Sequence, residues 1–324
     1  MYTPRLLVYL NWRASKLASA PVDRLTSKRV VWLATHYCVH RHSYLEHFKC
    51  FRRDFPKWQM PKRAVILADL HCGHKAGLTP LAYQSTPDDS ASGKVKCEAS
   101  LRKALWRLYA DKMQELKPID VCLVNGDVID GKGDKSGGTE QIEMDRHNQA
   151  EMGALAIGVA EADQYVITNG TGYHTGTDED FEKLLSQYLD NVTVKGHAFI
   201  DVNGCIIDAK HKVGSSQVPY GRASAVLKEK VWADIWNDVG VNPKSNIIVR
   251  SHVHYYEKIK NSQCTAIVTP ALQGLGTKYG TRQCSGLVDW GFLWADIEGP
   301  DDYEIKEFIP KEANGLQKVE VIKV

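Results

Sequence analysis

Two carboxylates and five imidazoles in this sequence are of the kind that bind divalent cations. They are Asp69, His71, Asp127, His174, His211, His252 and His254. Carboxylate oxygens and imidazole nitrogens together suit Mn, Fe or Zn, and two such ions about 3.5–4 Å apart can lower the pKa of a shared water and clamp a phosphoryl oxygen. The set contains no thiolate, which favours a catalytic centre over a closed structural zinc site. These residue types therefore indicate attack at phosphorus.

Each of these side chains lies at the end of a short apolar run or a few residues beyond it. The runs cover residues 64–70, 119–124, 165–168, 205–210 and 247–251. Apolar runs of this length, flanked by polar residues, are typical of strands that are buried on both faces. Because ligands of open α/β sheets collect at the carboxyl ends of the strands, we expect the seven side chains to meet at one rim.

From residue 60 onward the chain alternates apolar runs with amphipathic segments, which is typical of a layered α/β fold. Apolar residues at helical spacing predict helices at 97–116, 141–162, 178–189 and 221–237. Residues 73–96 read as a long loop over the rim. The last third of the chain predicts strands at 265–269, 291–297, 303–309 and 319–324, and we expect these to build a second sheet stacked on the first.

Composition places the chain among globular proteins, with 43% hydrophobic and 25% charged residues. No apolar run is long enough to span a bilayer, and the eight cysteines form no CxxC pair. Several cysteines lie in expected strands, which favours buried thiols and a cytoplasmic location. The net charge of +2 hides an asymmetry, because residues 1–59 hold 11 Lys and Arg against three Asp and Glu. We predict a basic N-terminal extension at 1–59 and one catalytic domain at 60–324.

Four blocks of sequence, in their order, resemble the calcineurin-like metallophosphoesterase superfamily. They are Asp69-Leu70-His71, Gly126-Asp127-Val128-Ile129-Asp130-Gly131, the lone His211, and Ser251-His252-Val253-His254. The stretches 137–141 and 170–176 are also similar to uncharacterised phosphoesterases of phages and prophages. The resemblance implies an α/β four-layer sandwich, in which two stacked mixed β-sheets are flanked by α-helices.

The same resemblance implies a role for each ligand. Asp69, His71, Asp127 and His254 would hold one metal, and Asp127 would bridge to a second metal held by His211 and His252. The implied cofactor is two divalent ions, with Mn favoured and Fe or Zn as alternatives. His174 would be the general acid that protonates the leaving oxygen. Tyr173 stands where the family has a metal-binding Asn, which leaves open whether Asn169, Thr171 or neither completes the shell of the second metal.

The function that follows is hydrolysis of a phosphate mono- or diester by a hydroxide activated at a dinuclear metal site. A nuclease is the leading hypothesis because of the basic segment 1–59 and the phage resemblance, although residues 60–324 carry an acidic excess. A nucleotide or a phosphoprotein is the competing substrate. Two alternatives remain: a scaffold of the same fold that binds metal without turnover, and a DNA-associated protein that binds through residues 1–59. No membrane contact is expected, and the sequence leaves the oligomeric state open.

Roles can also be predicted for several polar residues outside the seven candidate ligands. We expect Asp130 to support a ligand rather than to bind metal, and His147 and His197 to be surface or packing residues. Basic loop residues that could bind the substrate phosphate are Lys75, Lys132, Lys135, Arg222, Lys278 and Arg282.

Overall fold

The computed structural model describes residues 60–134, 136–175, 180–216, 218–262, 264–274 and 288–315. The expectations for the basic segment 1–59 and for a strand at 319–324 lie outside these ranges, and the division of the chain at residue 60 stays a prediction. Among the described helices, none combines the length and the apolar character that crossing a membrane requires.

The first sheet has the strand order β11-β10-β1-β2-β3-β4. Its strands are β1 (Lys62–Leu67), β2 (Val121–Asn125), β3 (Gln164–Thr168), β4 (Val192–Lys195), β10 (Phe292–Ile297) and β11 (Tyr303–Phe308). The four strands from β1 to β4 run parallel, whereas β10 pairs antiparallel with β1 and β11 pairs antiparallel with β10. The sheet is therefore mixed, with its antiparallel part at one edge.

The second sheet has the order β5-β6-β7-β9-β8. Its strands are β5 (Ala198–Val202), β6 (Cys205–Lys212), β7 (Ile247–Ser251), β8 (Glu257–Lys260) and β9 (Thr265–Val268). The inner strands β6, β7 and β9 are parallel, and the edge strands β5 and β8 are antiparallel to their neighbours. The expected strand at 265–269 lies in the second sheet as β9, but the prediction that 291–297 and 303–309 join it is wrong, because they form β10 and β11 and extend the first sheet.

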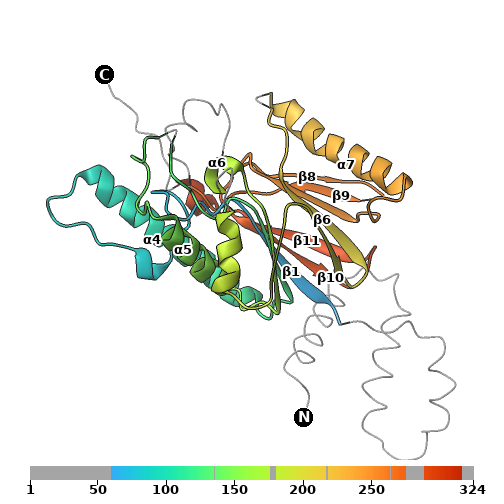
Figure 1. Cartoon of the computed structure of the whole chain (residues 1–324), viewed down its shortest axis with the longest axis horizontal. Coiled ribbons are helices and arrows are strands. Elements are labelled where there is room, and N and C mark those ends of the chain that lie inside the picture. Colours follow the sequence, from blue (N-terminus) through green and yellow to red (C-terminus); the bar gives the residue numbers. More distant parts are fainter. Residues whose placement is uncertain are drawn as a thin grey trace, which may run out of the picture. The chain divides into compact units, whose positions relative to one another are not determined.

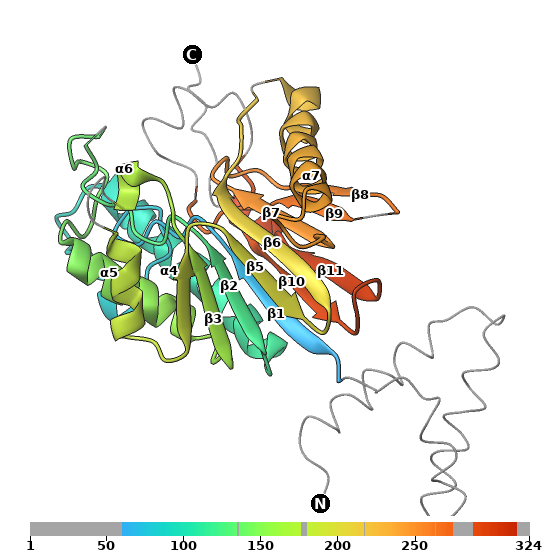
Figure 2. The ribbon, with the colours of Figure 1, turned by 45° about the vertical axis from the view of Figure 1, so that its right-hand side comes forward.

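Helices cover the outer face of each sheet (Figures 1 and 2). The helices α4 (Gly93–Leu116) and α5 (Arg146–Gly158) pack on the first sheet, and α7 (Arg222–Asp238) packs on the second. Side chains alternate along the strands, as the pleat requires. Val65 and Leu67 of β1 face α4 and α5, while Ala64 and Ile66 join Ile207, Val249 and Ile267 between the sheets. The expected α/β architecture of two stacked mixed sheets flanked by helices is confirmed.

Local signals set the helix ends better than periodicity does. The Asp145 carboxylate accepts hydrogen bonds from the backbone N–H groups of His147 and Asn148, so α5 begins at Arg146 rather than at 141. The helix predicted at 178–189 is described from residue 180 and is a 3-10 helix, η2 (Phe181–Gln187). Short segments complete the order: η1 (Leu81–Tyr83), α6 (Gly172–Thr175), η3 (Pro219–Gly221) and α9 (Lys311–Gly315).

Candidate metal centre

The carboxyl ends of five strands meet at one rim, and each brings part of a donor cluster. The segments after β1 and β2 run side by side, because Asp69 N–H donates to Gly126 O at 3.1 Å and His71 N–H donates to Asp127 O at 3.0 Å. The second sheet adds His211 from β6 and the segment His252–His254 after β7. His252 N–H donates to Asp69 Oδ2 at 3.2 Å, which ties the two sheets together at this point.

Backbone strain is concentrated at this rim. Five residues of the cluster have positive φ angles, which side chains with a Cβ rarely adopt: Asp69 (52°), His71 (46°), Asp127 (50°), His252 (78°) and His254 (55°). Such conformations cost about 1–3 kcal/mol each and persist only where the surroundings hold them. The strain aims five side chains at a common point at the expense of stability.

The first donor group consists of Asp69, His71 and His254, whose ligand atoms lie within 4.8 Å of one another. Asp69 Oδ1 is buried and accepts no hydrogen bond. His254 Nε2 lies 3.2 Å from this oxygen, and the Nε2 atoms of His71 and His211 each lie 4.0 Å from it. A buried carboxylate oxygen that is ringed by imidazole nitrogens and left without a hydrogen bond fits a divalent cation.

The second donor group consists of Asp127, His211 and His252. His211 Nε2 lies 3.0 Å from Asp127 Oδ2, and His252 Nδ1 lies 3.9 Å from the same oxygen. The other ring nitrogen of His211, Nδ1, is 2.7 Å from the carbonyl oxygen of Asn125 and donates to it. This hydrogen bond directs Nε2 toward the cluster, as is usual for metal-binding histidines. Asp127 also belongs to a group with His71 and His174, so its carboxylate lies between the donors of both sides.

The electrostatics favour a cation. Burial alone would raise the pKa of Asp127, but the His211 imidazole outweighs burial and holds this pKa well below its usual range. Burial acts on Asp69 in the same way, and His254 brings its pKa below the ordinary value. For His211, burial lowers the pKa, yet Asp127 and Asp69 raise it to about 10. Two ionised carboxylates therefore share this buried site, and a proton on His211 compensates part of their charge.

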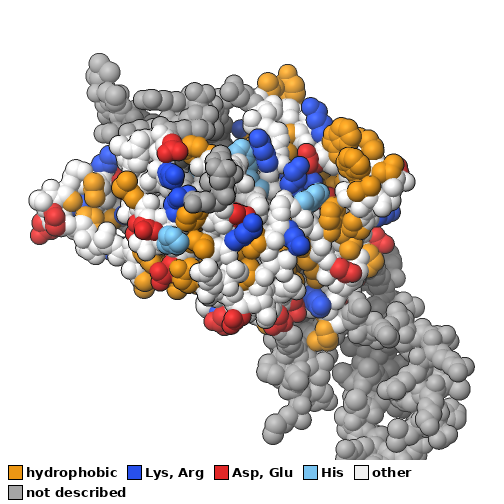
Figure 3. All heavy atoms as spheres, viewed as in Figure 1, with side chains coloured by type: hydrophobic (Ala, Val, Ile, Leu, Met, Phe, Trp, Pro, Cys, Tyr) orange, Lys and Arg blue, Asp and Glu red, His pale blue; other side chains and the backbone are white. Residues whose placement is uncertain are grey.

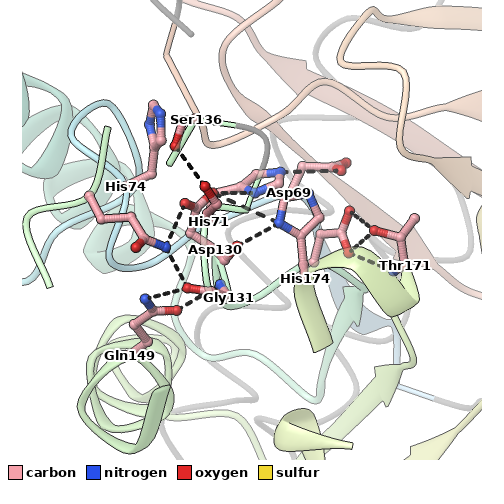
Figure 4. A network of polar contacts seen from close by, with 12 residues as sticks. Asp69, His71, His74, Asp130, Gly131, Ser136, Gln149, Thr171 and His174 are labelled. Atoms are coloured by element: carbon pink, nitrogen blue, oxygen red, sulfur yellow. Dashed lines mark hydrogen bonds and ion pairs between the residues drawn. The ribbon is translucent and has the colours of Figure 1, made fainter. Parts of the chain in front are cut away.

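His174 approaches the cluster from α6 and contacts Asp130 (Figure 4). Its Nδ1 donates to the Asp130 carbonyl oxygen at 2.7 Å, and its ring packs against that of His71 with centroids 4.5 Å apart. Asp130 Oδ1 is 3.3 Å from His71 Nδ1, so this carboxylate orients a candidate ligand. Burial, together with the nearby His71, lowers the pKa of His174 and thereby favours the neutral ring.

Asn169 and Thr171 occupy different places. Thr171 holds Asp127, because its N–H donates to Asp127 Oδ1 at 2.6 Å and its hydroxyl lies 3.2 Å and 3.3 Å from the two carboxylate oxygens. Asn169 Oδ1 is buried, accepts no hydrogen bond and belongs to a pocket that His211 also lines. Asn169 therefore offers the free oxygen donor on the His211 side.

Two buried residues that support the rim were missed in the sequence. Asn125 accepts a hydrogen bond from Thr168 Oγ1 at 2.8 Å and donates to Ser251 Oγ at 2.7 Å and to the Lys210 carbonyl oxygen, and it joins the two sheets. Glu182 accepts from Val128 N–H at 2.9 Å and from Gly170 N–H at 2.6 Å, which connects the segment directly after Asp127 to the loop after β3. Burial raises the pKa of Glu182 to about 8. Of these two residues, only Asn125 could have been noticed in the sequence, because it directly precedes Gly126 and Asp127.

Two of the six basic residues expected to bind phosphate have other contacts, and three lie outside the described residues. Lys75 pairs with Glu140 at 3.0 Å, and the Arg222 guanidinium lies over the Tyr255 ring at 4.4 Å. Lys132 is exposed, whereas Lys135, Lys278 and Arg282 lie outside the described residues. His147 is exposed and His197 pairs with Asp208 at 2.7 Å, so both lie away from the donor cluster.

No protein-family model matches the chain, and no curated protein matches it. Solved structures do match. Vps29 from Entamoeba histolytica in complex with zinc is 12% identical with a TM-score of 0.37, and the match covers 76% of this chain and 98% of that chain. A conserved uncharacterized protein from Streptococcus pneumoniae TIGR4, described as a predicted phosphoesterase, is 8% identical with a TM-score of 0.33, over 77% and 99% of the two chains. A novel archaeal phosphodiesterase is 10% identical with a TM-score of 0.36, over 76% and 99%.

At these identities and TM-scores the similarities say nothing about activity, so function has to come from the side chains of the rim. The fold and the site together define an α/β protein of two stacked mixed sheets whose rim carries clusters of Asp and His able to bind metal ions.

Proposed function

We propose that this chain is a calcineurin-like metallophosphoesterase that hydrolyses a phosphate mono- or diester with two divalent cations. The observation that carries the proposal is the position of Asp127, whose carboxylate belongs both to the group with His211 and His252 and to the group with His71. A carboxylate shared in this way suits a pair of ions about 3.5–4 Å apart. The phage-type resemblance of residues 170–176 is part of this proposal.

The donors divide into two shells. Asp69, His71, His254 and Asp127 would hold one cation, and Asp127, His211 and His252 would hold the other, with Asn169 Oδ1 as a further oxygen donor. When bound, the two cations would supply Lewis acidity for attack on phosphorus. Oxygen and nitrogen donors without thiolate suit Mn, Fe and Zn, and we propose Mn first.

His174 serves the leaving group in this proposal. Its Nδ1 is engaged by the Asp130 carbonyl oxygen, so Nε2 is the nitrogen free to act. The pKa of His174 is lowered in the free site, but the negative charge of a bound phosphate favours the protonated ring. A protonated Nε2 can then donate a hydrogen bond to a phosphoryl oxygen and pass its proton to the leaving oxygen.

The experiment measures bound metal and turnover on the same sample of the full chain. Protein loaded with Mn should hold two ions and should hydrolyse an aryl phosphate mono- or diester. Asp127→Asn should lose both properties, whereas Asp111→Asn, on the exposed surface of α4, should keep both. Two bound ions without turnover on either ester would favour the scaffold alternative, and the absence of bound metal would contradict the proposal.

Two further expectations stay proposals. Cys72, Cys122, Cys205 and Cys264 are buried free thiols, which supports the cytoplasmic location that we propose. Binding of DNA through the basic segment 1–59 concerns residues outside the described ranges.

A further inference from the structure

A pocket with two lysines opens beside the candidate metal centre. Its volume is about 330 Å³, and it is lined by Asn169, Gly170, Thr171, Gly172, Gly196, Lys210, His211 and Lys212. Lys210 and Lys212 are exposed and flank the buried His211 on β6. Within the described part of the chain, neither ammonium group forms an ion pair with a carboxylate. Two positive charges next to the proposed site of the scissile phosphate favour a further anionic group of the substrate.

A second pocket continues from the first along β6, because Lys210 lines both. It also has a volume of about 330 Å³, and α7 contributes Trp232 and Trp236 to its lining. Four positions separate these two residues, so they lie on the same face of the helix. Their side chains are 56% and 46% exposed. In Figure 3, blue Lys and Arg side chains and pale blue His side chains lie next to the orange hydrophobic side chains over α7.

Apart from Lys210, the charged groups of the second pocket pair with one another. Arg250 Nη1 pairs with Asp208 Oδ1 at 2.8 Å, and Arg250 Nε pairs with Glu229 Oε2 at 2.8 Å. His197 Nε2 is 2.7 Å from Asp208 Oδ1. The pocket therefore presents two exposed indole rings beside an internally paired set of charges. Such a surface suits a flat, uncharged ring that can stack, rather than a second phosphate.

We infer that the substrate of the proposed phosphoesterase is a single-stranded oligonucleotide that extends from the metal centre across these two pockets. This inference rests on the proposed function and adds the substrate class. The phosphate next to the scissile one lies between Lys210 and Lys212, and a base stacks on Trp232 and Trp236. Basic groups that follow the backbone and aromatic rings that stack bases are the two elements of single-strand binding. A phosphoserine peptide or a small monoester uses neither pocket fully.

Binding tests the inference without turnover. The full chain is titrated with a labelled oligothymidylate in a chelator at about 150 mM salt, and fluorescence anisotropy is recorded. Because one base–aromatic stack contributes about 1–3 kcal/mol, Trp232→Ala should weaken binding about 5- to 150-fold. Lys210→Ala should weaken binding and should reduce the slope of log Kd against log salt concentration by about one, which corresponds to one lost phosphate contact. The matched controls are Val231→Ala, equally 56% exposed on α7, and Lys228→Ala, exposed on the same helix.

Turnover supplies the second measurement. In Trp232→Ala, the ratio of kcat/KM for the oligonucleotide to kcat/KM for an aryl diester should fall, whereas Val231→Ala should keep the wild-type ratio. Equal affinity of Trp232→Ala and Val231→Ala for the oligonucleotide would overturn the inference. A phosphoserine peptide that competes as well as the oligonucleotide and loses affinity in Trp232→Ala would also overturn it. If the metal-loaded wild type hydrolyses no ester at all, the proposed function fails, and the anisotropy comparison still decides whether the pockets bind an oligonucleotide.

Discussion

The close approach of Gly170 to Asp127 allows a single methyl group to test the candidate metal centre. A Cβ at residue 170 would lie 2.2 Å from Asp127 Oδ1 and 2.4 Å from Asp127 N. Gly170 is not among the residues with positive φ, so alanine suits its backbone, and the effect of Gly170→Ala is steric. Ordinary contact begins at 3.4 Å, so the carboxylate oxygen and the backbone nitrogen of Asp127 both have to move away by about 1 Å.

A displacement of this size is large for a metal site. Ligand distances are held to within about 0.2 Å, so a shift of about 1 Å removes Asp127 from both proposed shells. Loss of a supporting contact usually lowers metal affinity about 10- to 100-fold, and we expect the upper end here, which corresponds to about 2.7 kcal/mol. Overpacking costs about 1–3 kcal/mol of stability, and each kcal/mol lowers Tm by about 2–4 °C in a domain of this size.

The assay compares Gly170→Ala with Gly172→Ala, where the added Cβ meets no atom within 4 Å. Both proteins are titrated with Mn and Zn by calorimetry, and Tm is recorded without metal. We expect Gly170→Ala to remain folded and to bind metal about 100-fold more weakly, while Gly172→Ala binds like the wild type. Wild-type metal affinity in Gly170→Ala would show that Asp127 is not a ligand, and equal losses in both variants would show that the loop acts only through its flexibility.

Three further outcomes follow from the contacts at the rim. Asn125→Ala should lower the free energy of unfolding, measured in urea, by about 2–4 kcal/mol, because the buried hydroxyls of Thr168 and Ser251 lose this hydrogen-bond partner. A change near zero would contradict the role of Asn125 in joining the sheets. The pKa of His211 is raised from 6.5 to about 10, so the protonated ring stabilises the metal-free chain fully below pH 6.5, and this stabilisation is lost as the pH rises toward 10. Between pH 6.5 and 10, metal binding should therefore release about one proton per chain, which calorimetry in buffers of different ionisation enthalpy measures. Metal binding without proton release would contradict the protonation of His211 in the metal-free chain. Mn or Zn at a hundredfold excess over Kd should raise the free energy of unfolding by about 2.7 kcal/mol, which is measured as an increase in Tm. An equal increase in Asp127→Asn would show that the metal binds elsewhere.

The layers of the fold could be predicted because their signal is local. Continuous apolar runs such as 64–70 and 119–124 are what strands buried on both faces require, and these runs became β1 and β2. Which strands pair is decided by contacts far apart in the sequence. Lys62 of β1 pairs with Ile297 of β10, and no residue near either strand predicts this pairing. The expectation of a separate C-terminal sheet failed for that reason.

Part of the candidate site could also be predicted from local sequence. Asp and His at strand ends point to a rim, but the residues that hold them there have no such signature. Glu182 lies on a short 3-10 helix and reaches the segments around Asp127 only after folding. The Ser251 hydroxyl forms hydrogen bonds with Asn125 and with Thr269 Oγ1 at 2.8 Å. These partners lie 126 and 18 positions away in the sequence, so the residue type of Ser251 alone does not predict them.

The ligands that we propose are divided between the two sheets. Asp69, His71 and Asp127 follow strands of the first sheet, and His211, His252 and His254 lie on or after strands of the second. Neither sheet alone holds a complete set for either proposed cation, so the proposal requires both sheets to be in register before a cation binds. The contacts of Asn125 with Ser251 and of His252 N–H with Asp69 fix that register without metal. Strain at five positive φ angles can then be offset by a cation that binds only the assembled rim, since binding to the native state alone stabilises that state.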